Sequence, residues 1–240
     1  MKKIILLCCL VFTSTAVWAD DATVSEHQYA GKVALGGLKT TGNTTVETFD
    51  SQLELNYSYQ SWAVDLSFQG EQTSDDGTLI ADYYEANLKG IYNAAWQTYA
   101  FALLNYREDF FGGIHAETSK LIGLGYHIFP ADNIFTADLE IGTGQRQTDK
   151  VNKNKLDVDP ISHGAIIMRY QPVAEHTFKA SITVEDGNDD SFIKKELSWT
   201  HTLFAPFEID FSYAERTLTA PAFGKTGTDS STSIKLGYAF

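Results

Sequence analysis

The chain is nearly free of cysteine. Its 240 residues include two, Cys8 and Cys9, and both lie in a short apolar run near the start of the sequence. No small residue precedes them and no spacer follows, so we do not expect a lipoprotein. Beyond Cys9 the sequence offers no thiol for a disulfide framework, a thiolate metal site or a cysteine nucleophile.

Basic residues are also scarce, with 18 lysines and arginines against 31 aspartates and glutamates. Without Lys2 and Lys3 the basic residues number 16, and the net charge becomes −15. A nucleic acid backbone requires cationic partners, so this balance excludes nucleic acid as an expected ligand. It also argues against docking on an anionic membrane surface.

Long apolar runs are missing beyond Phe12. A transmembrane helix needs about 20 apolar residues, so any membrane crossing must be made by strands. The first run is too short as well, and it carries the marks of an export signal. Lys2 and Lys3 form the positive region, Ile4–Phe12 the apolar region, and Val17–Ala19 the small-residue cleavage site.

These features divide the chain into three parts. Residues 1–19 are expected to be a signal peptide that is cleaved after Ala19. Residues 20–28 are expected to form a short periplasmic segment, and residues 29–240 a single β-barrel domain.

The sequence does contain a repeated alternation of apolar and polar residues. Between Phe49 and Tyr59 every second residue is apolar, apart from Ser51, and the residues between them are polar. A period of two produces two different faces only in a β-strand. The pattern recurs along the chain and predicts twelve strands in an all-β, antiparallel, up-and-down barrel.

The connections between these strands are predicted to alternate in length. Short turns are expected at Gln60–Ser61, Asn93–Ala95, Pro130–Asn133 and Ala205–Pro206, and longer polar loops at Ser74–Thr78, Arg107–Ala116, Gly144–Pro160, Asp186–Asp190 and Thr217–Asp229. Short periplasmic turns and longer extracellular loops are typical of outer-membrane barrels.

Aromatic residues near the strand ends also indicate an outer-membrane barrel. Tyr57, Tyr59 and Trp62 form one group, and Tyr92, Trp96 and Tyr99 form another. We expect both groups to belong to interfacial girdles. In the strand that contains Tyr99, however, both faces are apolar, so alternation does not fix its orientation.

A soluble barrel with apolar residues inside is the alternative. It would crowd the interior with large side chains, whereas a water-filled lumen suits the charged face. Placing that face in lipid would cost about 2–4 kcal/mol for each lysine or arginine at the midplane. The residues predicted to face the lumen are Asp50, Glu54, Asp65, Glu85, Lys89, Asp138, Glu140, Lys179, Lys194, Glu196, Glu208 and Asp210.

Three features of the sequence resemble a known family. The export signal, the Gly36–Thr44 segment and the last strand ending in Phe240 are similar to the YdiY-like family of salt-induced outer-membrane proteins of Gram-negative bacteria. Thr41–Thr44 is the most specific piece, and the similarity covers the chain from Asp20 onward. The resemblance implies an outer-membrane barrel and supplies no catalytic or binding residues.

The last strand also resembles the C-terminal signal that the barrel-assembly machinery reads. Its outward residues are Ile234, Leu236, Tyr238 and Phe240. The expected partners are therefore this machinery, outer-membrane lipid and lipopolysaccharide.

Serine–histidine pairs could indicate an enzyme that modifies lipid. In Ser162–His163 and Ser198–His201, however, the two residues lie an odd number of positions apart on a strand and face opposite ways. Pairs across neighbouring strands stay open, but nothing in the sequence selects one. We therefore expect no catalytic residue and no enzymatic activity.

The acidic run Glu185–Asp190 could hold calcium through its oxygen atoms. Its spacing does not match the EF-hand loop, and a solvated hairpin loop is the simpler interpretation. Asp149, Asp157 and Asp159 receive the same interpretation. We therefore expect no metal ion or other cofactor. Phe110 and Phe111 are expected either to contact ligand or lipopolysaccharide, to narrow the lumen, or to lie at the membrane interface.

Barrel size limits the function. Eight strands leave an interior filled by side chains and sixteen leave a channel, so twelve predict a narrow pore or a closed cavity. An excess of acids would favour cations or neutral polar solutes. If the charges pair with one another, the lumen is instead plugged. A small passive pore or an envelope-integrity protein is expected, with a lipid-modifying enzyme and a structural or adhesion barrel as alternatives.

Overall fold

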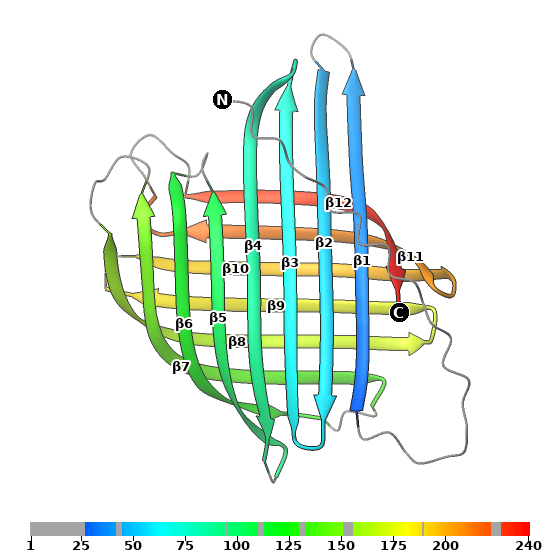
Figure 1. The fold of residues 1–240 in the computed structure, drawn as a ribbon, viewed down its shortest axis with the longest axis vertical. Helices are drawn as coiled ribbons and strands as arrows, with labels where there is room; N and C mark the ends of the chain where they lie inside the picture. Colours follow the sequence, from blue (N-terminus) through cyan, green and yellow to red (C-terminus); the bar gives the residue numbers. More distant parts are fainter. Residues whose placement is uncertain are drawn as a thin grey trace.

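Twelve antiparallel strands form a closed barrel in the computed structural model of the chain (Figure 1). The structure describes residues 27–41, 45–94, 96–109, 113–129, 133–150, 156–188, 190–221 and 227–240. The predicted signal peptide, most of the 20–28 segment, Gly42–Thr44, Phe110 and Phe111 lie outside these residues. The strands are β1 (His27–Thr41), β2 (Thr45–Tyr59), β3 (Trp62–Asp75), β4 (Thr78–Asn93), β5 (Thr98–Asp109), β6 (Ile114–His127), β7 (Phe135–Lys150), β8 (Asp157–Val173), β9 (His176–Gly187), β10 (Ser191–Phe204), β11 (Phe207–Leu218) and β12 (Thr228–Ala239).

Each strand pairs with its neighbours in the sequence, and β1 pairs with β12 to close the ring. The closing register sets Lys32 opposite Ala239 and Gly36 opposite Lys235. The predicted fold class, an up-and-down barrel of twelve strands, is confirmed. The closing ladder is short and pairs residues 32–36 of β1 with residues 235–239 of β12. No helix within the described ranges is long and apolar enough to cross a membrane.

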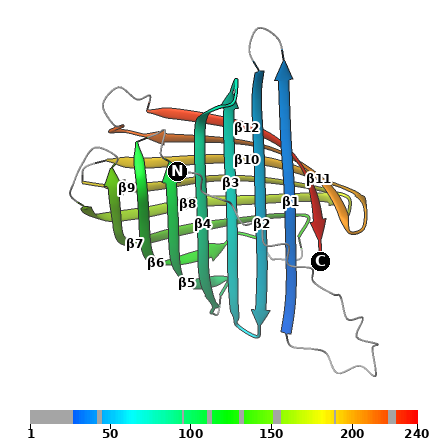
Figure 2. The ribbon, with the colours of Figure 1, turned by 45° about the horizontal axis from the view of Figure 1, so that its top comes forward.

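The barrel has two broad walls that face each other. Strands β1–β4 run side by side in the front wall of Figure 1, and β8–β12 run across them behind. Strands β5–β7 curve from one wall into the other, as the tilted view of Figure 2 also shows. Strands that are far apart in the sequence therefore face each other across the interior of the barrel.

An apolar belt surrounds the outside of the barrel. Side chains such as Ile122, Ile141, Ile234 and Leu236 point outward, with 57–70% of their surface exposed. At the edge of the belt near the β2–β3 turn, aromatic rings pack across neighbouring strands, as Trp62 and Tyr92 do with ring centroids 4.7 Å apart. The other edge of the belt becomes polar, for example at the Lys195–Glu215 ion pair of 2.8 Å.

Three of the five predicted long loops are mostly strand, and this part of the prediction is wrong. Strands β3, β5, β7 and β9 continue beyond the apolar belt, and β3 and β4 meet in a turn of only Asp76 and Gly77, both with positive φ. Asp-Gly is a preferred two-residue hairpin sequence. Ladder hydrogen bonds form equally well when both faces of a strand are polar, so loss of the alternation does not end the strand.

The predicted difference in length between the two ends of the barrel is correspondingly small. The β6–β7 connection, predicted as the short turn Pro130–Asn133, spans residues 128–134. It is longer than the connections that follow β3, β5 and β9 at the other end. Loop length alone is therefore a weak indicator of orientation in this chain.

Tyr99 was predicted to lie in an aromatic girdle, and this is also wrong. Tyr99 and Phe101 are 3% and 4% exposed and point into the barrel from β5. Their rings lie over Gly125 and Gly123 on β6, where a Cβ atom would collide with them. The missing side chains on β6 make room for two inward-facing rings.

Candidate functional site

The interior of the barrel is polar and is the candidate site. Asp50, Glu85, Glu140, Lys194 and Asp210 are buried, and the other predicted lumen residues except Lys179 are half-buried. Lys179 is exposed but still borders the larger of two interior cavities. Asp65 accepts a hydrogen bond from Asn56, and Asp138 lies 2.7 Å from His127 near the other end of the strands.

The larger cavity has a volume of about 230 Å³ and lies between β1–β4 and β8–β12. Its wall combines hydroxyl, amide and charged side chains. The charged residues that line it are Lys32, Asp50, Glu54, Glu71, Lys179, Glu196, Asp210, Arg216 and Lys235.

The smaller cavity has a volume of about 160 Å³ and lies between β4–β7 and β8–β10. The charged residues that line it are Glu85, Lys89, Arg107, Glu117, Glu140, Glu185, Lys194 and Glu196. Glu196 and Ile167 border both cavities, so the boundary between the two passes through the centre of the barrel.

Three ion pairs join opposite walls of the barrel, and we call them the cross-barrel pairs. Glu54 on β2 lies 3.8 Å from Lys179 on β9. Glu71 on β3 lies 3.9 Å from Arg216 on β11, and Glu85 on β4 lies 2.6 Å from Lys194 on β10. None of these strand pairs is adjacent in the sheet, so each ion pair spans the lumen. In all three pairs the acid belongs to β2–β4 and the base to β9–β11.

Additional contacts strengthen the two innermost cross-barrel pairs. The Arg216 guanidinium lies 3.7 Å from the centre of the Tyr83 ring, and the Tyr83 hydroxyl donates a 2.9 Å hydrogen bond to Glu85. Glu85 also accepts hydrogen bonds from Gln69 and Asn105. A buried carboxylate is tolerated when its oxygens are paired in this way.

Glu140 on β7 is the centre of another buried group. It pairs with Lys89, accepts a 2.5 Å hydrogen bond from the Tyr99 hydroxyl and lies 3.7 Å from Nε2 of His163. Lys89 also sits 4.8 Å from the centre of the Phe101 ring. The aromatic rings of β5 thus form part of the polar interior.

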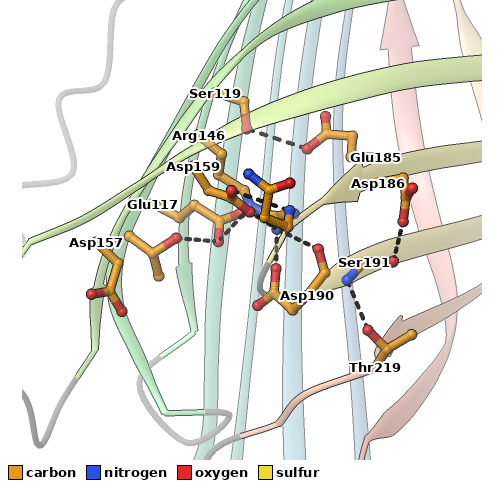
Figure 3. Close-up of polar contacts among 12 residues, drawn as sticks. Glu117, Ser119, Arg146, Asp157, Asp159, Glu185, Asp186, Asp190, Ser191 and Thr219 are labelled. Atoms are coloured by element: carbon orange, nitrogen blue, oxygen red, sulfur yellow. Dashed lines mark hydrogen bonds and ion pairs between the residues drawn. The ribbon is translucent and has the colours of Figure 1, made fainter.

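Arg146 on β7 anchors a cluster at the end of the barrel where the β7–β8 and β9–β10 hairpins lie (Figure 3). Its side chain is 1% exposed and pairs with the carboxylate of Asp190, whose backbone carbonyl it also contacts at 2.9 Å. Asp159 and Glu117 each lie 4.0 Å away. Glu117 in turn accepts hydrogen bonds from Thr148 and, at 2.5 Å, from Arg107. This cluster fills the interior between β5–β8 and the start of β10.

The acidic run Glu185–Asp190, which begins within β9, contributes to these contacts. Glu185 accepts a hydrogen bond from Ser119, Asp186 accepts one from Ser191, and Asp190 pairs with Arg146, as Figure 3 shows. Asp189 lies outside the described residues. The carboxylates point at different protein partners, and within the described ranges no group of three or more histidine, aspartate or glutamate side chains could hold a metal ion.

The serine–histidine candidates remain apart. Ser162 is exposed on the outside of β8, whereas His163 is 6% exposed inside the barrel. Ser198 lines the larger cavity, and the His201 ring stacks on His176 with centroids 4.6 Å apart. In the described part of the chain neither histidine hydrogen-bonds to a serine. The structure therefore assembles no nucleophile and base from these residues.

Sequence reasoning missed several charged residues that the structure brings into the interior. Arg107, Arg146 and Asp159 fall in segments that were predicted as loops, and Glu117 directly follows one of them. Extending the alternation of β5–β8 by a few residues would have found them, because they continue the inward parity of each strand. The other residues that were missed are Lys32, Glu71, Arg216 and Lys235.

Comparison with known proteins gives a family and a fold. The family model described as "Protein of unknown function, DUF481" matches residues 33–240. No curated protein matches the chain. The NanC porin structure is similar with a TM-score of 0.53 and 10% identity, covering 87% of this chain and 98% of the porin chain.

Two other solved barrels are less similar. An outer membrane channel from Pseudomonas putida F1 has a TM-score of 0.49 and 10% identity, covering 92% of this chain and 99% of the channel. The KdgM porin has a TM-score of 0.45 and 8% identity, covering 88% and 98%. Of these three structures only the NanC porin has a TM-score above 0.5, and at 10% identity the similarity supports the barrel fold alone.

Proposed function

The chain belongs to the DUF481 family, and we propose that it is an outer-membrane channel that passively conducts small polar solutes, with a preference for cations. The observation that carries the proposal is the pair of polar cavities enclosed by the barrel. An apolar belt around a polar interior is the arrangement of a barrel that spans a membrane.

The sign of the preference follows from the charges that line the cavities. Five acidic and four basic side chains line the larger cavity, and five acidic and three basic ones line the smaller cavity. A lumen with an excess of carboxylates attracts cations by focusing the field between low-dielectric walls. Since most of the charges are paired, we expect the preference to be modest.

The cellular setting is part of the same proposal. The first 19 residues would direct export and be removed, and Ile234, Leu236, Tyr238 and Phe240 would be read by the barrel-assembly machinery. In the outer membrane the belt would contact lipid and lipopolysaccharide. The YdiY-like, salt-induced character suggested by the sequence belongs to this proposal as well.

Conductance in planar bilayers tests the proposal. The purified barrel should open small channels, and a potassium chloride gradient should give a reversal potential on the cation side. Asp50 lines the larger cavity without a carboxylate–cation bond of its own, so Asp50→Asn should shift the reversal potential toward zero. Glu175→Gln is the matched control, because Glu175 is exposed in the β8–β9 turn. Absence of channels, or anion preference in the unmodified protein, would overturn the proposal.

A structural role in the envelope is a second candidate, and the cross-barrel pairs favour it. They join opposite walls and occupy part of the lumen. A purely structural barrel would give no channels in the same bilayers, and cells without it would show envelope defects. The scattered serine and histidine positions give no corresponding support to a lipid-modifying enzyme, which labelled phospholipid and lipopolysaccharide would reveal by turnover.

A further inference from the structure

A glycine on β12 allows a charge pair to form across one intervening strand. Lys32 on β1 reaches over Gly237 on β12 and places Nζ 2.6 Å from Asp210 and 3.0 Å from Glu208 on β11. A Cβ atom at position 237 would lie 3.1 Å from the Lys32 side chain and 3.4 Å from Asp210. The missing side chain thus leaves the space in which this ion pair forms.

The same arrangement occurs one strand further around the barrel, but there the pair is not made. Gly36 on β1 is in register with Asp50 on β2 and with Lys235 on β12. Strands are about 4.8 Å apart, so the two flanking backbones are separated by about 10 Å. Asp50 and Lys235 both line the larger cavity, and between them β1 presents only Gly36, where the Cγ atom of Lys235 lies 2.8 Å from the position of a Cβ atom.

Both charges in this gap lack an ion-pair partner of opposite sign in the described ranges. Asp50 is 9% exposed and forms no hydrogen bond or ion pair with the described residues. Its neighbour Glu71 is paired with Arg216. Among the described residues, Lys235 donates only to the hydroxyls of Ser233 at 3.1 Å and Ser212 at 3.3 Å. A buried charge without a partner is costly, so both groups favour a ligand that supplies the missing charges.

We propose that the Gly36 gap binds a small zwitterion, with the ligand's ammonium group at Asp50 and its carboxylate at Lys235. This inference rests on the proposed channel function, since the ligand must enter the lumen. A cavity of about 230 Å³ admits a molecule of amino-acid size. A singly charged molecule would satisfy one of the two groups and leave the other unpaired.

Calorimetric titration of the purified full-length protein in detergent tests the site without requiring conduction. The probe is β-alanine, and propionate and propylammonium are its singly charged analogues. β-Alanine should bind about tenfold more tightly than either analogue, because it alone completes both charge interactions.

Two variants connect the binding to the gap. Asp50→Asn and Lys235→Gln should each reduce β-alanine affinity about tenfold. Asp50 forms no hydrogen bond or ion pair with the part of the chain that the structure describes, so the asparagine variant removes no such bond there and should fold. Glu175→Gln and Lys195→Gln change exposed charges outside the lumen and should bind like the unmodified protein. Faster migration of unheated protein on a gel confirms that each variant is folded.

The outcomes separate the site from the channel. Equal affinity for all three probes, no binding of β-alanine, or unchanged affinity in both gap variants would overturn the zwitterion site even if the protein conducts potassium chloride. Conversely, absent conductance with intact, gap-dependent β-alanine binding would overturn the channel and leave the site in place.

Discussion

Individual charges inside this barrel are stabilised by partners that the chain supplies from distant positions. Arg146 is the clearest case, since its guanidinium is almost fully buried among Glu117, Asp159 and Asp190. Removing one member of such a group leaves the others buried without compensation. An exposed ion pair such as Lys195–Glu215 has water as an alternative partner and contributes little.

Arg146→Met should therefore destabilise the folded barrel by about 3–5 kcal/mol. The methionine keeps much of the side-chain volume, so the loss reports the charge and its hydrogen bonds. Lys195→Met is the control and should leave the stability almost unchanged, because water can replace its exposed ion pair. Urea unfolding in lipid vesicles measures both values. Similar losses in the two variants would show that the Arg146 cluster does not hold the structure together.

At the scale of elements, β5 shows how a neighbouring strand decides orientation. Both faces of β5 are apolar, and its aromatic face turns inward because Gly123 and Gly125 on β6 leave room for Tyr99 and Phe101. Tyr99 then reaches Glu140 on the next strand, β7. The sequence pattern of β5 alone does not show which of its two faces points into the barrel.

Gly125→Val should interfere with folding of the β5–β6 pair. The new side chain would occupy the position of the Tyr99 ring, and overpacking of this kind costs about 1–3 kcal/mol or more. Gly90→Val is the matched control, because nothing lies within 4 Å of a Cβ atom at position 90. The fraction of protein that migrates as folded on unheated gels measures the effect. Equal folding of both variants would contradict the inward packing of Tyr99.

The outward-facing residues of β12 indicate the position of the membrane boundary along this strand. Leu236 lies within the apolar belt, and Thr232 lies beyond it on the same face of the strand. Leu236→Arg should reduce the folding free energy in vesicles by about 2–4 kcal/mol, and Thr232→Arg by about 0–1 kcal/mol. Equal costs at the two positions would contradict a membrane boundary between them.

At the scale of the whole molecule, the cross-barrel pairs span a single lumen that contains two cavities. Glu85 and Lys194 meet near the boundary, where Glu196 borders both spaces. A barrel of twelve strands is wide enough for a passage and narrow enough for side chains to reach across it. The resistance of the channel should therefore depend on these side chains.

The double variant Glu85→Ala/Lys194→Ala should raise single-channel conductance severalfold. It removes both side chains of the pair, so it widens the passage without leaving a lone buried charge. Lys195→Ala/Glu215→Ala removes an ion pair from the outside of the barrel and should leave conductance unchanged. An unchanged current in the Glu85/Lys194 variant would place the narrowest point elsewhere.

The sequence by itself determined the strand number, the barrel class and the two faces of most strands. It could do so because a period of two forces alternate residues such as Leu55 and Asn56 onto opposite sides. It also predicted that Ser162 and His163 point to opposite faces, because adjacent residues of a strand always do so. The strand ends were harder to predict, because polar ladders beyond the belt look like loops when only hydrophobicity is considered.

Only the tertiary structure decided which charges meet. Glu85 and Lys194 are 109 positions apart, and their contact depends on how the closed sheet flattens and which walls face each other. The same holds for the gap at Gly36, where closure of β1 onto β12 places Lys235 and Asp50 on either side of one glycine. The alternation within a strand determines whether a side chain points into the barrel. Its contact partner depends on the registers between strands and on the curvature of the sheet, which the sequence of one strand does not determine.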